Sequence, residues 1–388
     1  MAAVWIRSND SAEIERTCFG QDYARHSILL RNILDVPSEF SYTEAMENAK
    51  TIYDIAKEAG VSASTVSRVV NHKPGIHEET RKKVQALLDK YNYSPNEAAR
   101  GLVTQSSRII GILIEDIRVS HHTESAYVIE QEMTRLGYTC ITLSTGPDPQ
   151  RKAEYIRILE QRRVEGVILM GSMFGTKEVE DSIREHLPKV PIAMVNGFLD
   201  LPNVYAVLSD EERGLEACAS MLIGKGRRHL AFVEDLETPS NYNKRRGFLT
   251  AMLRLGVPQE EAWIYYAYQK QGEDANPQHT ILRGQEATRR ILSEHPEVDG
   301  ILYSVDLLAI GGLEELKAQG RSVPGDVAVL GVDNTLYGTI CTPRLTTLDN
   351  KLVEVSKNAG RMLLDALEKR DVSHRMLLPT EIIVRETT

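Results

Sequence analysis

The chain has 388 residues, of which 42% are apolar and 26% are charged, an ordinary composition for a protein of two or three domains. No apolar run approaches about 18 residues, and the first ten residues turn polar too soon for a signal peptide, so we expect a cytoplasmic protein without a membrane span. The net charge is −9, but residues 50–108 carry 10 Lys and Arg against 6 Asp and Glu, a local +4 that leaves −13 elsewhere. This asymmetry suits a nucleic-acid contact in the basic region, although a solvated basic face would give the same count.

The first 48 residues give little structural signal. Their composition is mixed and acidic, they contain no clear repeat, and one candidate helix runs through HSILLRNIL, residues 26–34.

The cysteine pattern excludes a disulfide framework and a zinc site. Cys18, Cys140, Cys218 and Cys341 lie far apart, without C-x-x-C spacing and without a histidine at metal-ligand spacing. We therefore expect reduced thiols and no bound metal.

A short helix and a tight corner begin the basic region. The apolar residues that recur there at helical spacing are Ile52, Ile55, Ala56 and Ala59. Thr51, followed three residues later by Asp54, predicts a capping box at the start of this helix. Gly60 then supplies a left-handed corner, and Ser62 caps a second helix that continues to about residue 70.

The second helix, within AGVSASTVSRVVNHKPG, presents many short polar side chains. Val66 and Val69 turn inward, which leaves small and hydroxyl side chains and Arg68 on the surface. Short hydroxyls let a helix enter a DNA major groove and bond phosphates or base edges, and an arginine reaches guanine with a forked pair of bonds. A third helix over about residues 78–91 closes a helix-turn-helix, the alternative being a small helical bundle with polar outer faces.

Two stretches of this region carry a family resemblance. TIYDIAKEAGVSASTVSRVVN, followed by NYSPNEAARGL, resembles the DNA-binding head and hinge of the LacI-type (lactose-repressor and galactose-repressor) family of bacterial transcription regulators. The resemblance implies base reading in the major groove by Ala63, Ser64 and Arg68, and phosphate contacts and positioning by the other residues. The complete DNA-contacting set that it implies is Tyr53, Ser62, Ala63, Ser64, Thr65, Ser67, Arg68, Asn71, Asn96, Arg100 and Leu102.

The resemblance also implies that residues 95–107 form a hinge helix, which pairs with the hinge of a second copy in the minor groove. Leu102 would be the apolar wedge at the central base step, with Asn96 and Arg100 holding the backbone nearby. Such a wedge costs a few kcal/mol of unstacking, which is offset by the contacts that kinked DNA permits.

Strands alternate with amphipathic stretches of helical length after Arg108. The apolar runs are IIGILI (109–114), YTCITL (138–143), GVILMG (166–171), PIAMV (191–195), HLAFV (229–233), GILYS (300–304) and VAVLGV (327–332). Near-continuous apolar strands between helices indicate parallel sheets covered on both faces. We expect a two-lobed α/β fold with a ligand site at the carboxyl ends of the strands, between the lobes.

This part is similar to the effector domain of the same family, a relative of periplasmic sugar-binding proteins. The similarity rests on GVILMGS, VNG, SDEERG, GRRHLAFV, the segment from SVDLLAIGG to GVDN, and PRLTTLDN, so that it covers residues 51–388. We expect an extension at 1–48, the head at 49–94, the hinge and linker at 95–107, and the effector-binding and dimerisation domain at 108–388. The extension has no counterpart in the family, whose members would begin near Met46; it is either a misassigned start or an appended segment.

The effector site is implied partly by the resemblance and partly by strand ends. Its expected residues are His121, His122, Asn196, Asp210, Ser240, Asn241, Lys244, Asp306 and Asp333. The histidines are alternatively exposed loop residues, and Asp306 is alternatively an ordinary helix cap. Family members often place an arginine three residues before the Gly-Phe pair, where this chain has Lys244, a flexible point charge in place of a planar fork. The departure affects the identity of the ligand more than the existence of the site.

These patterns favour a ligand-responsive transcription regulator, most simply a repressor, that binds a sugar or sugar phosphate, or alternatively a purine or nucleoside. A periplasmic binding protein would need a signal peptide. A sugar-modifying enzyme would need a catalytic or nucleotide motif, and GKGRRH (224–229) lacks the phosphate-loop spacing. We expect no cofactor, no catalysis, and a homodimer on a near-palindromic DNA operator, because no leucine heptads follow the last strand, LPTEIIV.

Overall fold

The computed structural model describes residues 50–70, 73–91, 93, 106–268 and 276–388. The chain divides into two compact units, one ending at Glu97 and the other beginning at Ala98, and each is described by itself. Within the described residues, no helix is long and apolar enough to cross a membrane.

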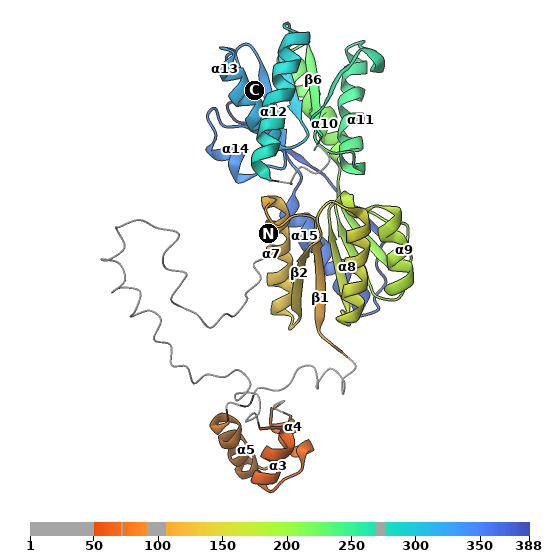
Figure 1. The fold of residues 1–388 in the computed structure, drawn as a ribbon, viewed down its shortest axis with the longest axis vertical. Helices are drawn as coiled ribbons and strands as arrows, with labels where there is room; N and C mark the ends of the chain where they lie inside the picture. Colours follow the sequence, from red (N-terminus) through yellow and green to blue (C-terminus); the bar gives the residue numbers. More distant parts are fainter. Residues whose placement is uncertain (1–49, 71–72, 92, 94–105, 269–275) are drawn as a thin grey trace, which may run out of the picture. The chain divides into compact units, whose positions relative to one another are not determined.

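The first unit is a helix-turn-helix followed by a third helix (Figure 1). Its helices are α3 (Ile52–Ala59), α4 (Ala63–Val70) and α5 (Glu78–Lys90). The predicted capping box is present: the Thr51 hydroxyl accepts the Asp54 N–H at 3.3 Å, and the Asp54 carboxylate accepts the Thr51 N–H at 2.9 Å. Gly60 has a φ of 69°, which confirms the predicted left-handed corner.

Three helices enclose a small apolar core. Its buried residues are Ile55, Ala56, Ala59, Val66, Val69, Val84 and Leu88. The short Ala56 and Ala59 side chains let α3 and α4 approach closely. Glu58 ties the end of α5 to α3, because its carboxylate accepts hydrogen bonds from the Tyr91 hydroxyl at 2.8 Å and from the Lys90 ammonium at 3.0 Å.

The second unit contains two six-stranded sheets, one in each lobe. Its strands are β1 (Ile109–Ile114), β2 (Thr139–Ser144), β3 (Gly166–Met170), β4 (Ile192–Val195), β5 (Val204–Ser209), β6 (Leu230–Glu234), β7 (Trp263–Tyr266), β8 (Gly300–Tyr303), β9 (Ala328–Val332), β10 (Thr346–Asp349), β11 (Arg375–Leu378) and β12 (Glu381–Ile383). The first sheet has the order β11-β5-β4-β3-β1-β2, and the second has the order β12-β10-β9-β8-β6-β7. All pairings are parallel except that of β10 with β12.

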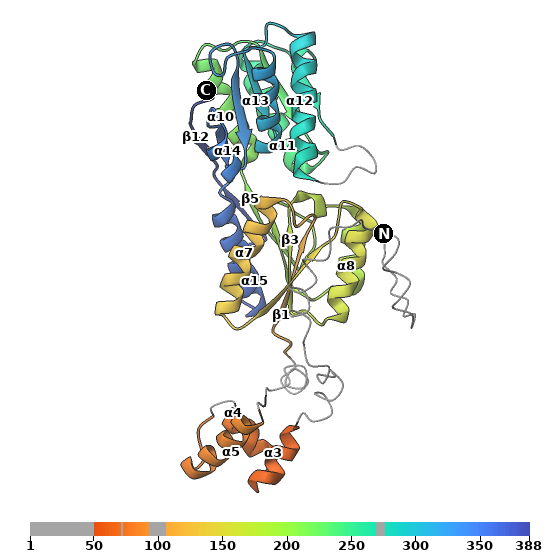
Figure 2. The same ribbon diagram turned by 60° about the vertical axis from the view of Figure 1, so that its left-hand side comes forward.

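Helices cover both faces of each sheet (Figures 1 and 2). They are α7 (Ser120–Arg135), α8 (Pro149–Gln161), α9 (Lys177–His186), α10 (Glu211–Gly224), α11 (Pro239–Arg254), α12 (Pro277–Glu294), α13 (Asp306–Ala318), α14 (Leu336–Ile340) and α15 (Leu352–Leu367), with single turns η2 (Ser172–Phe174) and η3 (Gln259–Glu261). In the first lobe α7 and α15 pack on one face of the sheet and α8 and α9 on the other. In the second lobe the corresponding pairs are α12 with α13 and α10 with α11. The expected two-lobed α/β fold with parallel-dominated sheets is confirmed.

The chain passes between the lobes three times, after β5, after β10 and after β11. Consequently, α15 packs in the first lobe although β10 before it lies in the second (Figure 2). The predicted final strand, LPTEIIV, covers β12, which joins the second sheet, and only the last residue, Leu378, of β11, which joins the first sheet; a break at residues 379–380 separates the two strands. Pro379 lies at this break, where it has no ladder hydrogen bond to lose.

The seven predicted strands within 109–332 are present as β1, β2, β3, β4, β6, β8 and β9, each displaced by no more than one residue at either end. Strand β10 escaped prediction because its sequence, TTLD, reads as polar. Thr346 and Thr347 are nevertheless fully buried, and their hydroxyls are bonded inside the protein.

Candidate functional site

The exposed face of α4 carries a small network of hydroxyl groups. The Ser62 hydroxyl accepts the Thr65 N–H at 3.2 Å, which is the predicted capping bond. The same hydroxyl shares hydrogen bonds with the hydroxyls of Ser64, at 2.8 Å, and Thr65, at 2.9 Å. These bonds hold three short side chains in place at the start of the helix.

The predicted DNA-contacting residues differ in exposure. Ser62, Ser64, Arg68 and Tyr53 are exposed. Ala63, Thr65 and Ser67 are half-buried. Asn71, Asn96, Arg100 and Leu102 lie outside the described residues. The surface of α4 therefore combines a low, hydroxyl-bearing start with one long cationic side chain near its end, which can approach a groove closely and reach a base edge.

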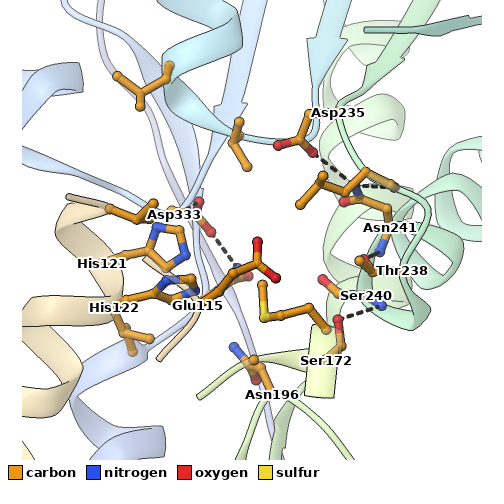
Figure 3. A pocket seen from close by; sticks show the side chains of 18 of the residues that line it. Glu115, His121, His122, Ser172, Asn196, Asp235, Thr238, Ser240, Asn241 and Asp333 are labelled. Atoms are coloured by element: carbon orange, nitrogen blue, oxygen red, sulfur yellow. Dashed lines mark hydrogen bonds and ion pairs between the residues drawn. The ribbon is translucent and has the colours of Figure 1, made fainter. Parts of the chain in front are cut away.

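A cleft of about 170 Å³ lies between the two lobes of the second unit (Figure 3). Its walls come from the carboxyl ends of β1, β3, β4, β6 and β9 and from the helices that follow them. This is the position at which doubly wound sheets bind ligands. The lobes touch across the cleft, since the Ser240 N–H of the second lobe donates to the Ser172 hydroxyl of the first at 3.4 Å.

The structure brings most of the predicted effector residues to this cleft. Those that line it are His121, His122, Asn196, Ser240, Asn241, Lys244, Asp306 and Asp333. Asp210 is not in the lining. Its carboxylate instead caps α10 by accepting the Arg213 N–H at 3.2 Å, and the next residue, Glu211, lines the cleft in its place.

The two histidines lie in the first turn of α7, with their ring centroids 4.3 Å apart. Burial and the nearby Lys244 ammonium lower the pKa of His121 to about 4. Burial and the neighbouring His121 lower the pKa of His122 to about 3. Both rings are therefore neutral near pH 7 and serve as hydrogen-bonding groups there.

Lys244 is enclosed by acceptors. Its ammonium donates to the Ser304 carbonyl at 3.1 Å and to the Asn241 side chain at 3.3 Å, and it lies 3.5 Å from the Glu211 carboxylate. Burial lowers the pKa of Lys244, but the carboxylates of Glu211, Asp333 and Asp235 outweigh it and hold the pKa above its usual range. Its neighbours Arg245 and Arg246 point elsewhere: they pair with Glu234 and Glu212.

Asp306 and Asp333 have different environments. Asp306 is the first residue of α13 and not its cap, and its carboxylate accepts bonds from Thr335, at 2.7 Å from the N–H and 2.9 Å from the hydroxyl, and from the Thr347 hydroxyl at 2.6 Å. Burial and the charge of Asp333 raise the pKa of Asp306 to about 7. Asp333 accepts one bond from the Asn350 amide at 3.0 Å and lies 4.0 Å from His121, and burial raises its pKa.

The lining also contains polar residues that were not predicted, among them Glu115, Glu211, Asp235 and Asn350. Glu115, Asp235 and Asn350 each directly follow a strand, namely β1, β6 and β10. A search for polar residues at strand ends would have found Glu115 and Asp235. Asn350 follows the strand that was itself missed. Glu211 directly follows Asp210, the residue that was predicted in its place.

Two further features of the cleft are structural. Asn196 has a φ of 50°, which asparagine tolerates better than most residues, and its side-chain oxygen accepts the Ser209 N–H at 2.8 Å. The described residues contain no group of three or more His, Cys, Asp or Glu side chains that could hold a metal ion.

A helix-turn-helix unit, together with a two-lobed body whose cleft is polar, defines a DNA-binding transcription regulator with an effector domain. Residues 51–96 match the family of bacterial regulatory proteins called the lacI family, and residues 219–388 match the periplasmic binding protein-like domain. An HTH-type transcriptional regulator of Lachnoclostridium phytofermentans is 30% identical over 339 residues, which cover 87% of this chain and 99% of the relative. The chain belongs to the LacI family.

Two other relatives extend the comparison. A ribose operon repressor of Halalkalibacterium halodurans is 30% identical over 341 residues, which cover 87% of this chain and 97% of the repressor. The crystal structure of the lac repressor dimer bound to operator and an anti-inducer superposes with a TM-score of 0.76 at 23% identity, over 87% of this chain and 98% of that chain. The similarity to the lac repressor structure concerns the fold.

Proposed function

We propose that this regulator is a repressor whose operator affinity is controlled by a polyhydroxylated effector of the sugar class, bound between the lobes. The observation that carries the proposal is a set of polar side chains in the lining: carboxylates, amides and neutral imidazoles from both lobes converge on one cleft. Such groups match the alternating donors and acceptors of ligand hydroxyls.

On the DNA side, we propose the division of roles that the family pattern implies. Ser64 and Arg68 read base edges, with Ala63 beside them, while Tyr53, Ser62, Thr65, Ser67 and Asn71 position the helix on phosphates. Residues 95–107 form the hinge, in which Leu102 opens the central base step and Asn96 and Arg100 hold the backbone. The exposure of Ser64 and Arg68 on α4 supports the first part.

Effector binding is coupled to DNA binding if the effector changes how the lobes close. The three crossovers are short, so that a change in lobe closure moves them together. In a homodimer, this movement alters the interface between first lobes and thereby the spacing of the two hinges. The change in operator affinity equals the differential binding of the effector to the two states. The lac repressor dimer is the supporting precedent for the assembly.

We further propose that the chain acts in the cytoplasm and catalyses no reaction. The relatives described above are named as regulators, and the cleft carboxylates are engaged in bonds within the fold. Turnover of a sugar or nucleotide by the pure protein would contradict the absence of catalysis.

Selection of bound duplexes from random DNA tests the proposed regulator directly. The expected result is a near-palindromic consensus of two half-sites, because a two-fold dimer presents two α4 helices. An Arg68→Ala chain serves as the matched control and should enrich a less constrained consensus. Enrichment of no motif by the unmodified chain would contradict the proposal.

A further inference from the structure

The charges that line the cleft do not balance. Its carboxylates belong to Glu115, Glu211, Asp235, Asp306 and Asp333, whereas its cationic side chains are Lys244 and Arg283. One further cation, Lys152, lies behind the wall and pairs with Glu115 at 2.6 Å. The histidines add no charge near pH 7. The described lining therefore carries more acidic than basic groups even when Lys152 is counted and Asp306, whose pKa is about 7, is left out.

The more deeply buried cation of the cleft, Lys244, is already engaged by protein acceptors. Lys244 directs its ammonium at Ser304, Asn241 and Glu211, which accounts for its three donors. Arg283 donates to the Thr280 hydroxyl at 3.0 Å. An anionic ligand would have to compete with these partners and would also face the surplus of carboxylates.

One buried acceptor in the wall lacks a donor. Asn350 is 4% exposed and gives its amide N–H to Asp333, yet no hydrogen-bond donor among the described residues reaches its side-chain oxygen. Nδ1 of the buried His122 is also without a hydrogen-bond partner among those residues, and it donates or accepts according to the tautomer of the ring. In Figure 3, Asp333 lies beside His121 on one side of the space and Asp235 lies on the opposite side. The wall is therefore rich in acceptors and calls for donors from the ligand.

We propose that the effector is a polyol that carries a protonated amine, an amino sugar in chemical class, whose ammonium faces the carboxylates of Asp235 and Asp333. This inference rests on the proposed function. Hydroxyl and ammonium groups both donate, so that this ligand supplies the wall with hydrogen bonds and reduces its excess negative charge. A phosphorylated sugar brings acceptors and negative charge, and is disfavoured on both counts.

Calorimetric titration of the full chain with matched sugars tests the inference. Each series contains one amine (D-glucosamine, D-galactosamine or D-mannosamine), its N-acetyl derivative, the parent hexose and the hexose 6-phosphate. In at least one series the amine should bind roughly tenfold more tightly than the N-acetyl and parent sugars, with the phosphate weakest. Equal or tighter binding of the neutral or phosphorylated members, or failure of every amine to bind, would overturn the inference.

Two cleft variants locate the amine. Asp235→Asn and Asp333→Asn should each reduce the preference for the amine over its parent sugar several-fold. Glu237→Gln is the matched control, since Glu237 is exposed and outside the lining although it lies only two residues from Asp235, and it should keep the preference. A thermal melt verifies the fold of each variant, and the titrations of the unmodified chain decide the question if a variant does not fold.

The inference and the proposed function can fail separately. If a neutral or phosphorylated sugar binds best and changes operator affinity, the proposed regulator function is supported and the inference of an amine-bearing effector is wrong. If the amine binds best but DNA selection enriches no motif, the inferred ligand class is supported and the proposed function as a sequence-specific regulator is wrong.

Discussion

Asp306 shows how one buried carboxyl group can make stability depend on pH. Its oxygens accept bonds from Thr335 and Thr347, and so tie the start of α13 to the segments after β9 and within β10. These bonds favour the carboxylate, but burial and the charge of Asp333 prevail and raise the pKa to about 7 from an ordinary 3.8. The folded protein therefore holds this proton more tightly than the unfolded chain does.

The sign of the resulting pH effect follows from this shift. The contribution of Asp306 to stability is fully present below about pH 4 and is lost as the pH rises through about 7, a change of roughly 4 kcal/mol at most. We predict that Asp306→Asn removes this loss, so that unfolding free energy falls less between pH 5 and 8 in the variant than in the parent. Urea denaturation at several pH values measures the free energy of unfolding of both proteins. If this free energy changes with pH to the same extent in the variant and the parent, Asp306 is not the source of the pH dependence.

Arg68 is the second residue from which a measurable effect is expected. Because a forked arginine–guanine pair discriminates between bases, Arg68→Ala should cost about 1–3 kcal/mol on the selected operator and little on random DNA. Tyr53→Phe, which removes a hydroxyl assigned to phosphates, is the comparison and should weaken binding to both DNAs similarly. Fluorescence anisotropy with both duplexes measures the difference in binding free energy. An equal loss of affinity for the operator and for random DNA in Arg68→Ala would show that Arg68 contacts the DNA phosphate backbone and not a base.

Individual cleft residues were predictable to the extent that their signal was local. Asp333 and Lys244 could be placed because a strand end and a Gly-Phe pair lie beside them in the sequence. The partners of Lys244 could not be foreseen, since Glu211 and Ser304 are 33 and 60 residues away and meet it only in the folded lobe. Whether a charged side chain is available to a ligand depends on such distant partners.

At the scale of elements, Gly247 determines how closely α10 and α11 pack. A Cβ at this position would lie 2.0 Å from the Glu212 carbonyl oxygen. Only glycine permits this approach, which also brings Lys244, three residues earlier on α11, to Glu211 at the start of α10. The helix contact thus contributes to the electrostatics of the cleft.

Gly247→Ala should therefore force the two helices apart and destabilise the fold by about 1–3 kcal/mol. Gly224→Ala is the matched control, because Gly224 is also helical and a Cβ there meets nothing within 4 Å; it should be neutral or slightly stabilising. Chemical denaturation compares the two variants, and similar stabilities would contradict the close-packing explanation.

Most strands with continuous apolar sequence were predicted, but β5 (VYAVLS) and β7 (WIYY) were missed, as were strands of mixed sequence. Strand β3 is fully buried and reads GVILM, so that its position was evident. Strand β10 buries two threonines, and β11 alternates between exposed and half-buried residues, so that their place in a sheet depends on partners elsewhere in the chain. That β11 joins the first sheet and β12, only two residues later, joins the second depends on how the chain crosses between the lobes and not on the local sequence.

At the scale of the whole molecule, α14 in the second lobe offers a surface for the proposed homodimer that would extend the interface between the first lobes. Leu336 and Ile340 are 71% and 68% exposed, and their i, i+4 spacing places them on one side of the helix. Exposed apolar pairs of this kind are stabilised by association. The double variant Leu336→Glu/Ile340→Glu should therefore sediment as a monomer at concentrations where the parent is a dimer.

Leu253→Glu is the control for this prediction, because Leu253 is 67% exposed on α11, and it should leave the dimer intact. Sedimentation velocity distinguishes the forms. A dimer in the double variant would place the interface elsewhere, and a stable tetramer of the parent would contradict the proposed assembly.

The central claim is that a ligand held between the lobes changes the affinity of the head for DNA. Fluorescence anisotropy of the selected operator, with and without a sugar that calorimetry has shown to saturate the chain, tests this claim most directly. We predict a change in operator Kd of about 5- to 150-fold, as expected for a coupling free energy of 1–3 kcal/mol, and a much smaller change on random DNA. An operator Kd that is the same with the cleft empty and saturated would contradict the account.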